Sequence, residues 1–144
     1  MMKIRPATTK DAAALAALSS QLGYPATPEI IARRLLDLDG RPDEHAVLVA
    51  LDQADAVIGW THVSVLRPLE MQPCGEILGL IVDEHARTVG VGRQLVAAAE
   101  AWARTRGFAE IVVRSNAART LSHPFYERIG YQRLKSQHYY QRPL

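Results

Sequence analysis

A glycine-containing loop between an apolar segment and a helical pattern constrains the fold of this chain more than any other feature. The run from Glu76 to Val82 is nearly continuously apolar and too short for a typical helix, which predicts a buried central strand. After the loop, apolar residues recur at helical spacing, at Val91, Leu95, Ala98 and Trp102. The loop itself reads Arg87-Thr88-Val89-Gly90-Val91-Gly92. A strand, a tight loop and a long helix must therefore follow one another directly.

The backbone of this loop is suited to binding an anion. The first N–H groups of a helix have no partner within the helix, and the helix dipole places partial positive charge beside them. Gly90 and Gly92 carry no Cβ atom that would hold a phosphate away from these amides, and Arg87 can add a charged donor. The alternative interpretation is that both glycines only permit a tight turn.

Two widespread phosphate-binding motifs do not fit the loop. A Walker loop would end in Gly-Lys followed by Ser or Thr, but Arg93-Gln94 follows Gly92 here. A dinucleotide-binding fingerprint would need a third glycine where this chain has Leu95. The loop is therefore expected to bind its anion in another way.

Capping and periodicity signals divide the rest of the chain into further elements. Thr8 with Asp11 forms a capping box, and Thr27 is an N-cap before a first-turn proline. These signals predict helices that end before Gly23 and Gly40. A shorter helix is predicted at 125–129, and strands are predicted at 3–7, 46–51, 56–66, 110–114 and in the tail 131–142.

Composition is that of an ordinary globular protein, with 48% hydrophobic and 22% charged residues. The length of 144 residues predicts a single domain, 1–144. A formal charge of +2 with scattered arginines disfavours a nucleic-acid partner, and five histidines without ligand spacing disfavour a metal. No apolar run is long enough for a signal peptide or a membrane span, so we expect a cytoplasmic protein without membrane contacts.

Two motifs in this chain resemble those of the GNAT superfamily of N-acetyltransferases. The first is Leu80-Ile81-Val82 followed by the loop 87–92, which matches the family pattern Arg/Gln-x-x-Gly-x-Gly/Ala. The second begins at Asn116 and continues through 123–131, with a Phe-Tyr pair and a Gly-aromatic pair. The resemblance implies an α/β fold (α+β by some schemes), with a mixed, mostly antiparallel sheet of six to seven strands and about four helices.

The chain departs from the family pattern at three positions. Glu84 stands where a proline is common, and Thr88 replaces a frequent glycine. Pro124 lies directly before Phe125, and a proline deep inside a helix is costly. We therefore predict that this helix begins late, with Ser122 as N-cap and Pro124 in the first turn.

The resemblance implies that acetyl-CoA is the cosubstrate and that no metal takes part. The backbone of Leu80, Ile81 and Val82 would hold the pantetheine arm and polarise the thioester carbonyl. The loop residues Arg87, Thr88, Val89, Gly90, Val91 and Gly92, with Arg93, would hold the pyrophosphate, and Asn116 would contact the cofactor arm. The acceptor amine would attack directly, without a covalent enzyme intermediate.

Two further residues are implied in proton transfer. Glu76 occupies the strand position where histone-type members carry a general base; a water chain is the alternative base, and a structural acid the alternative role. Tyr126 matches a tyrosine that donates to the CoA sulfur in many relatives, and the alternative is an ordinary core aromatic.

The resemblance leaves the acceptor open. We predict a small-molecule primary amine because the chain is minimal and its second motif is similar to those of small-amine enzymes. The alternatives are a protein lysine or N-terminal acetyltransferase and a non-catalytic acyl-CoA sensor. Many relatives pair, so a homodimer is expected.

Overall fold

The computed structural model describes the backbone of residues 2–86, 90–115 and 122–144. The chain forms two compact units, Met1–Val113 and Arg114–Leu144. In the first unit, one mixed sheet separates two helical layers. The described residues of the second unit form one short helix and a tail without regular secondary structure.

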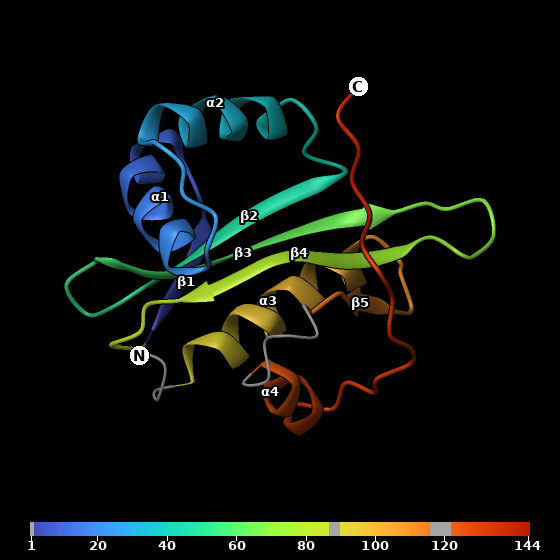
Figure 1. Cartoon of the computed structure of the whole chain (residues 1–144). Helices are drawn as coiled ribbons and strands as arrows, with labels where there is room; N and C mark the ends of the chain where they lie inside the picture. The colour runs from blue at the N-terminus through green and yellow to red at the C-terminus, as the bar shows by residue number, and fades with distance from the viewer. Residues whose placement is uncertain (1, 87–89, 116–121) are drawn as a thin grey trace. The chain divides into compact units, whose positions relative to one another are not determined.

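The sheet has five strands in the described residues, in the order β1-β2-β3-β4-β5 (Figure 1). The strands are β1 (Lys3–Pro6), β2 (His45–Leu51), β3 (Val57–Leu66), β4 (Cys74–Val82) and β5 (Ile111–Val113). All neighbouring pairs are antiparallel except β4 and β5, which are parallel. This confirms a mixed, mostly antiparallel sheet.

The expected number of six to seven strands is larger than the described chain contains. The difference lies in the tail, because residues 131–144 form no strand in the structure. Aromatic and β-branched side chains favour extended backbone, but a strand also needs a partner edge for its hydrogen bonds. The tail has the composition of a strand, but it forms no hydrogen-bonded ladder with another strand.

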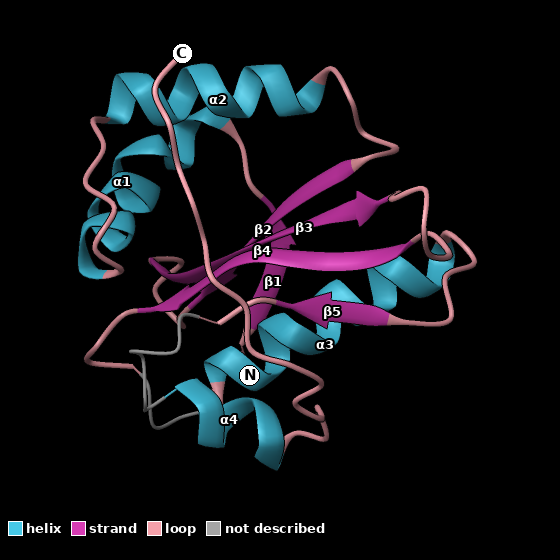
Figure 2. Cartoon of the chain, turned by 45° about the vertical axis from the view of Figure 1, so that its right-hand side comes forward, coloured by secondary structure: helices cyan, strands magenta, loops and turns pink. Residues whose placement is uncertain are grey.

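Two helical layers cover the sheet from opposite sides (Figure 2). The first layer contains α1 (Ala12–Gln21), preceded by the 3₁₀ helix η1 (Thr9–Asp11), and α2 (Pro28–Asp39). The second layer is α3 (Val91–Thr105). One core cluster lies between α1, α2 and the sheet and contains Leu15, Leu35, Val49 and Leu51. A second cluster of Ala50, Val91 and Leu95 lies between the sheet and α3.

The predicted caps begin the helices of the first layer. The Thr8 side chain accepts from the backbone of Lys10, and the backbone N–H of Thr8 donates to Asp11, which completes the capping box. Arg5 also donates to both carboxylate oxygens of Asp11, at 2.8 and 3.0 Å. At α2, the Thr27 side chain accepts from the backbone of Ile30 at 3.2 Å. Local sequence therefore determines where both helices begin.

The helix of the second unit is α4 (Ser122–Arg128), and Gly130 follows it with a positive φ of 103°. Pro124 lies in the first turn, as predicted. Ser122 is the first helical residue, so its predicted role as the N-cap outside the helix is wrong. A proline within the first turn is tolerated because the first N–H groups have no partner within the helix.

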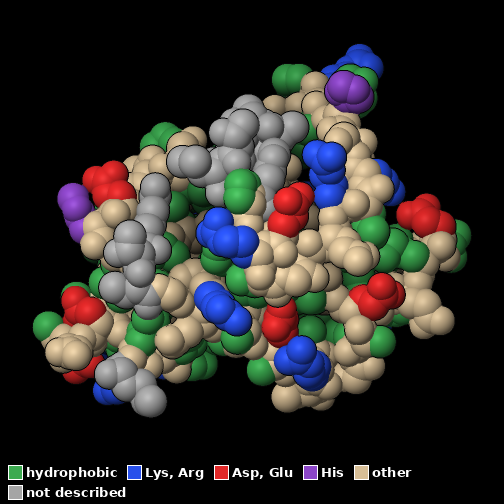
Figure 3. Space-filling model, turned by 90° about the horizontal axis from the view of Figure 1, so that it is seen from below, with side chains coloured by type: hydrophobic (Ala, Val, Ile, Leu, Met, Phe, Trp, Pro, Cys, Tyr) green, Lys and Arg blue, Asp and Glu red, His purple; other side chains and the backbone are tan. Residues whose placement is uncertain are grey.

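None of the described helices combines the length and apolar character that crossing a membrane requires. Within the described residues, no three His, Cys, Asp or Glu side chains are grouped so that they could hold a metal ion. Seen from below, basic and acidic side chains are interspersed over the described part of the surface (Figure 3).

Candidate active site

Strand β4 continues beyond the end of its parallel neighbour β5. β5 pairs with β4 at Gly75 to Ile77, and the ladder ends there while β4 continues to Val82. No described strand accompanies residues 78–81 on this side. Successive N–H groups of a strand point to opposite edges, so this edge presents backbone donors and acceptors. An extended ligand can therefore pair with the second half of β4.

A β-bulge marks the point where β4 and β5 separate. On the β3 side, His62 pairs with Gly79 and Val63 pairs with Ile77, so Leu78 is the extra residue. Leu78 is 51% exposed, which corrects the prediction that this strand is buried on both faces. A bulge bends and twists its strand locally, and this accounts for the outward position of Leu78.

The chain after β4 turns tightly and is tied to neighbouring elements. The N–H of Asp83 donates to the carbonyl of Ile58 at 2.8 Å, and the N–H of Ala86 donates to the carbonyl of Asp83. The N–H of Glu84 donates to Oε1 of Gln21, at the end of α1, at 3.3 Å. These contacts fix the path from β4 towards α3. Arg87, Thr88 and Val89 lie outside the described residues.

The start of α3 retains the features expected of an anion site. Gly90 precedes the helix with φ of 78°, and a Cβ at this position would meet no atom within 4 Å. No side chain caps the helix, and its first turn contains no acidic residue. Val91 is fully buried in the cluster that Leu80 and Val82 also contact. The uncapped end of α3 is therefore held against the second half of β4.

Glu76 lies in the first half of β4, on the face of the sheet away from α3. Its neighbour Gly75 faces α3, because a Cβ on Gly75 would lie 2.9 Å from Cβ of Ala103. Successive residues of a strand point to opposite faces, so Glu76 points to the other side. Its exposed fraction is only 4%, and its register partner on β3 is Ser64.

Two further predicted site residues follow Val113 in the sequence, beyond the first unit. Asn116 lies outside the described residues. Tyr126 belongs to the second unit, where its ring contacts Phe125 edge-on at 5.1 Å and Tyr131 at 5.8 Å between centroids. These ring contacts are compatible with both interpretations of Tyr126, as a packed core aromatic and as a hydrogen-bond donor to the CoA sulfur. The contact of Tyr126 with the CoA sulfur stays a prediction.

Sequence reasoning missed a histidine pair on β2 and β3. Nδ1 of His45 and Nε2 of His62 are 3.1 Å apart, within hydrogen-bond distance. Burial lowers the pKa of His62 to about 4, with smaller contributions from His45 and Arg41. Burial, with Arg41, also lowers the pKa of His45, against the opposing effect of Glu44 and Asp37. In the sequence, the alternation of side chains along a strand could have placed His62 and Ser64 on one face of β3. The pairing of His62 with His45 depends on the register between two strands.

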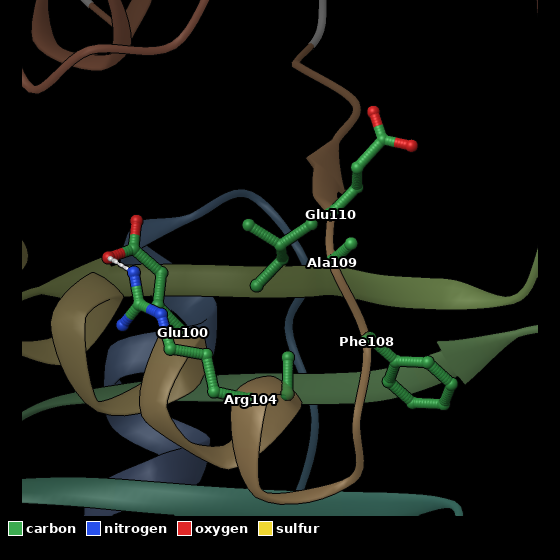
Figure 4. Close-up of a pocket in the computed structure, with 7 residues that line it drawn as sticks. Glu100, Arg104, Phe108, Ala109 and Glu110 are labelled. Atoms are coloured by element: carbon green, nitrogen blue, oxygen red, sulfur yellow. Dashed lines mark ion pairs between the residues drawn. The ribbon is translucent and has the colours of Figure 1, made fainter.

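A small surface depression lies at the other end of α3 (Figure 4). It is lined by residues of the last turns of α3 and of the segment entering β5, and on the α3 side Glu100 and Arg104 form an ion pair at 3.9 Å. Arg104 is 14 residues after Gly90, which corresponds to about 20 Å along a helix. This depression is therefore separate from the uncapped end of α3.

A family model described as Acetyltransferase (GNAT) family matches residues 12–131. The chain belongs to the GNAT acetyltransferase family. It is an acetyl-CoA-dependent N-acetyltransferase. Among curated GNAT relatives, the chain is 30% identical over 147 residues to the aminoglycoside N(6')-acetyltransferase type 1 of Stenotrophomonas maltophilia. The match covers 98% of this chain and 93% of that protein.

Solved structures of GNAT enzymes share the fold over their whole length. The aminoglycoside 6'-N-acetyltransferase AAC(6')-Ih from Acinetobacter baumannii has a TM-score of 0.85 at 19% identity, covering 100% of this chain and 99% of that one. AAC(6')-Iy, in complex with a bisubstrate analogue of CoA and acetylneamine, has a TM-score of 0.83 at 21% identity, with 100% and 99% covered. At these identities the likeness supports the fold alone.

Proposed function

We propose that this GNAT enzyme transfers an acetyl group from acetyl-CoA to a primary amine of a small molecule, by direct attack in a ternary complex. The observation that carries the proposal is the open edge of β4 leading to the uncapped N-terminus of α3. The strand edge suits an extended amide chain, and the helix end suits a diphosphate. Pantetheine pyrophosphate presents these two groups in succession.

The loop and the first turn of α3 would hold the pyrophosphate. The N–H groups of Val91, Gly92 and Arg93 stand in the first turn, where a helix supplies no partners. Gly90 leaves open space at its missing Cβ, so a phosphate can approach the backbone closely. Arg87, Thr88 and Val89 complete this site in the proposal by the resemblance of their motif.

The strand edge would hold and activate the thioester. Backbone groups at Leu80, Ile81 and Val82 would bind the pantetheine arm, and one N–H would donate to the thioester carbonyl. Donors fixed at that oxygen stabilise the negative charge of the tetrahedral intermediate. Holding both substrates in one complex also removes part of the entropic cost of their encounter.

The acceptor must lose a proton before it can attack. An alkylammonium with a pKa of about 10.4 is neutral in about one molecule in a thousand at pH 7, which corresponds to about 4 to 5 kcal/mol. Glu76 is the proposed base, directly or through water, because it is buried in β4 close to where β4 and β5 separate. When the intermediate collapses, Tyr126 would stabilise the leaving thiolate by donating to sulfur, and Asn116 would contact the cofactor arm.

An amine on an amino sugar is the first acceptor to test. The reason is the 30% identity to an aminoglycoside N(6')-acetyltransferase over nearly the whole of both chains. Protein lysines or N-terminal amines are the alternative acceptors, and an acyl-CoA sensor is the non-catalytic alternative. The homodimer, the cytoplasmic location and the absence of a metal remain predictions.

Amine-dependent release of CoA thiol tests the reaction. Purified protein with acetyl-CoA is assayed against amino sugars, simple alkylamines, and peptides with a lysine or a free N-terminus. The proposal expects release with small amines well above the rate without an acceptor. Turnover confined to peptides would establish the protein alternative. Tight CoA binding with background release across the panel would establish the sensor.

Two glycines offer a matched test of the cofactor site. Gly90 and Gly107 both have positive φ, 78° and 83°, and neither would place a Cβ within 4 Å of another atom. Tryptophan at either position therefore has similar backbone strain. We expect CoA to raise the melting temperature of Gly107→Trp as in the unmodified protein, and to leave that of Gly90→Trp unchanged. Equal stabilisation of both variants would contradict the proposed pyrophosphate site.

A further inference from the structure

A row of polar side chains crosses three strands on the face that carries Glu76. The sheet register places Glu76 opposite Ser64, and Ser64 opposite His45. Residues directly opposite one another share a face, with Cβ atoms about 4.5 to 5.5 Å apart. His62 lies two residues before Ser64 on β3 and therefore shares that face too. The row lies near the ends of β3 and β4 that extend beyond α1 and α2 (Figure 1).

The two histidines in this row are joined and differ in their surroundings. The 3.1 Å separation of Nδ1 of His45 and Nε2 of His62 leaves each ring a second nitrogen outside the bond. Burial disfavours the cation at both rings and lowers both pKa values, that of His62 to about 4. Both rings are therefore neutral at pH 7, and each carries one N–H and one lone pair.

The charges around the pair lie on the His45 side. Arg41, Glu44 and Asp37 act on His45, and Arg41 also acts on His62. The side chains of these three charged residues are 42% to 74% exposed, so this end of the pair is open to solvent. Glu44 and Asp37 favour a proton on His45. His62 shares its face of β3 with Ser64, two residues along the strand, and Ser64 lies opposite both His45 and buried Glu76.

We propose that His62 and His45 carry the acceptor's proton from Glu76 to solvent. The inference rests on the proposed function, which makes Glu76 the base. The proton reaches Nδ1 of His62 from Glu76 through the Ser64 hydroxyl or a water. His62 passes its Nε2 proton to Nδ1 of His45, and His45 releases its Nε2 proton to solvent. One proton enters and one leaves, both rings end neutral, and exchange with water restores the starting tautomers.

His62 and His45 act here through Glu76, as positioning residues for a proton rather than as groups that touch the amine. The test is therefore rescue by a diffusible base, which a purely structural role would not show. In His62→Ala, kcat with the amine acceptor is expected to fall about a hundredfold. Added imidazole should restore it in proportion to concentration. KM for acetyl-CoA should stay unchanged.

Controls separate the relay from a loss of structure. His138→Ala removes an exposed histidine and should keep the original rate with or without imidazole. Glu76→Gln combined with His62→Ala should be no slower than Glu76→Gln alone, because both changes interrupt one path. Where His62→Ala does not fold, His45→Gln at the exposed end carries the same test and should lower kcat.

The outcomes are distinguishable from failure of the proposed function. Absence of amine-dependent turnover in the unmodified protein would refute the proposed function and the relay together. Normal turnover with an unchanged kcat in His62→Ala and His45→Gln would refute the relay alone. A slow His62→Ala that imidazole does not restore, with effects additive to Glu76→Gln, would assign the pair a structural role and overturn the relay.

Discussion

Acidification should destabilise this protein through His62, in a pH range that the structure defines. In the folded protein burial holds the pKa of His62 at about 4, against an ordinary value of 6.5. The unfolded chain therefore binds a proton at this residue below pH 6.5, and the folded chain does so only near pH 4. Because the unfolded state binds more protons in this range, stability falls as the pH falls from 6.5 to 4.

The size of the effect follows from the same two values. At about 1.4 kcal/mol for each pH unit, the interval from 6.5 to about 4 corresponds to roughly 3.5 kcal/mol of unfolding free energy. His45 acts in the same direction, because its pKa is also lowered. Asp11 affects stability in a lower pH range. The Arg5 guanidinium lowers the pKa of Asp11 below 3.8, so the stabilising contribution of Asp11 is lost only below that pH.

His62→Gln isolates the contribution of His62. At pH 7 the variant is expected to be less stable by about 1 kcal/mol, because a hydrogen bond to His45 is changed. It no longer protonates at this position, so its unfolding free energy should fall less on acidification. The two curves of stability against pH should therefore cross between about pH 6 and 5, and the variant should be the more stable protein at pH 4.5.

Urea unfolding followed by circular dichroism at pH 7, 6, 5 and 4.5 measures these curves. His138→Gln, the same substitution at an exposed side chain, is the control and should follow the original protein. The reasoning is refuted if His62→Gln loses as much stability between pH 7 and 4.5 as the unmodified protein does.

Three further predictions concern packing, an ion pair and catalysis. Gly75→Ala should lower the unfolding free energy by about 1 to 3 kcal/mol, since its Cβ would lie 2.9 Å from that of Ala103, whereas Gly40→Ala, in helical backbone, should be nearly neutral in the same denaturation assay. Arg5→Ala should cost about 1 to 2 kcal/mol at pH 7, and less at a pH well below 3.8, where Asp11 becomes protonated; an equal loss at both pH values would contradict the ion pair. Tyr126→Phe should lower kcat with little change in CoA affinity by calorimetry, and an unchanged kcat would remove Tyr126 from the site.

Local signals account for the parts of the fold that the sequence predicted well. The capping box at Thr8 and the N-cap Thr27 act within a few residues, so they can be read without knowing the rest of the chain. The strand before the loop and the helix after it, β4 and α3, were predicted for the same reason. The two family motifs also lie in continuous sequence, and the family itself was confirmed.

Pairing between distant segments accounts for what the sequence did not reveal. The tail from Tyr131 has strand composition, but no local rule tells whether a partner edge is available to it. The bulge at Leu78 and the short β4–β5 ladder likewise depend on register with other strands. These two features expose the edge of β4 that the proposed cofactor site requires.

The sequence by itself determined the order of elements from β1 to α4 and the enzyme family, since each depends on patterns within neighbouring residues. Only the tertiary structure decided that Glu76, Ser64 and His45 form one row and that His62 meets His45 across 17 positions of the chain. The physical reason is strand register: a shift of one residue would send these side chains to the opposite face.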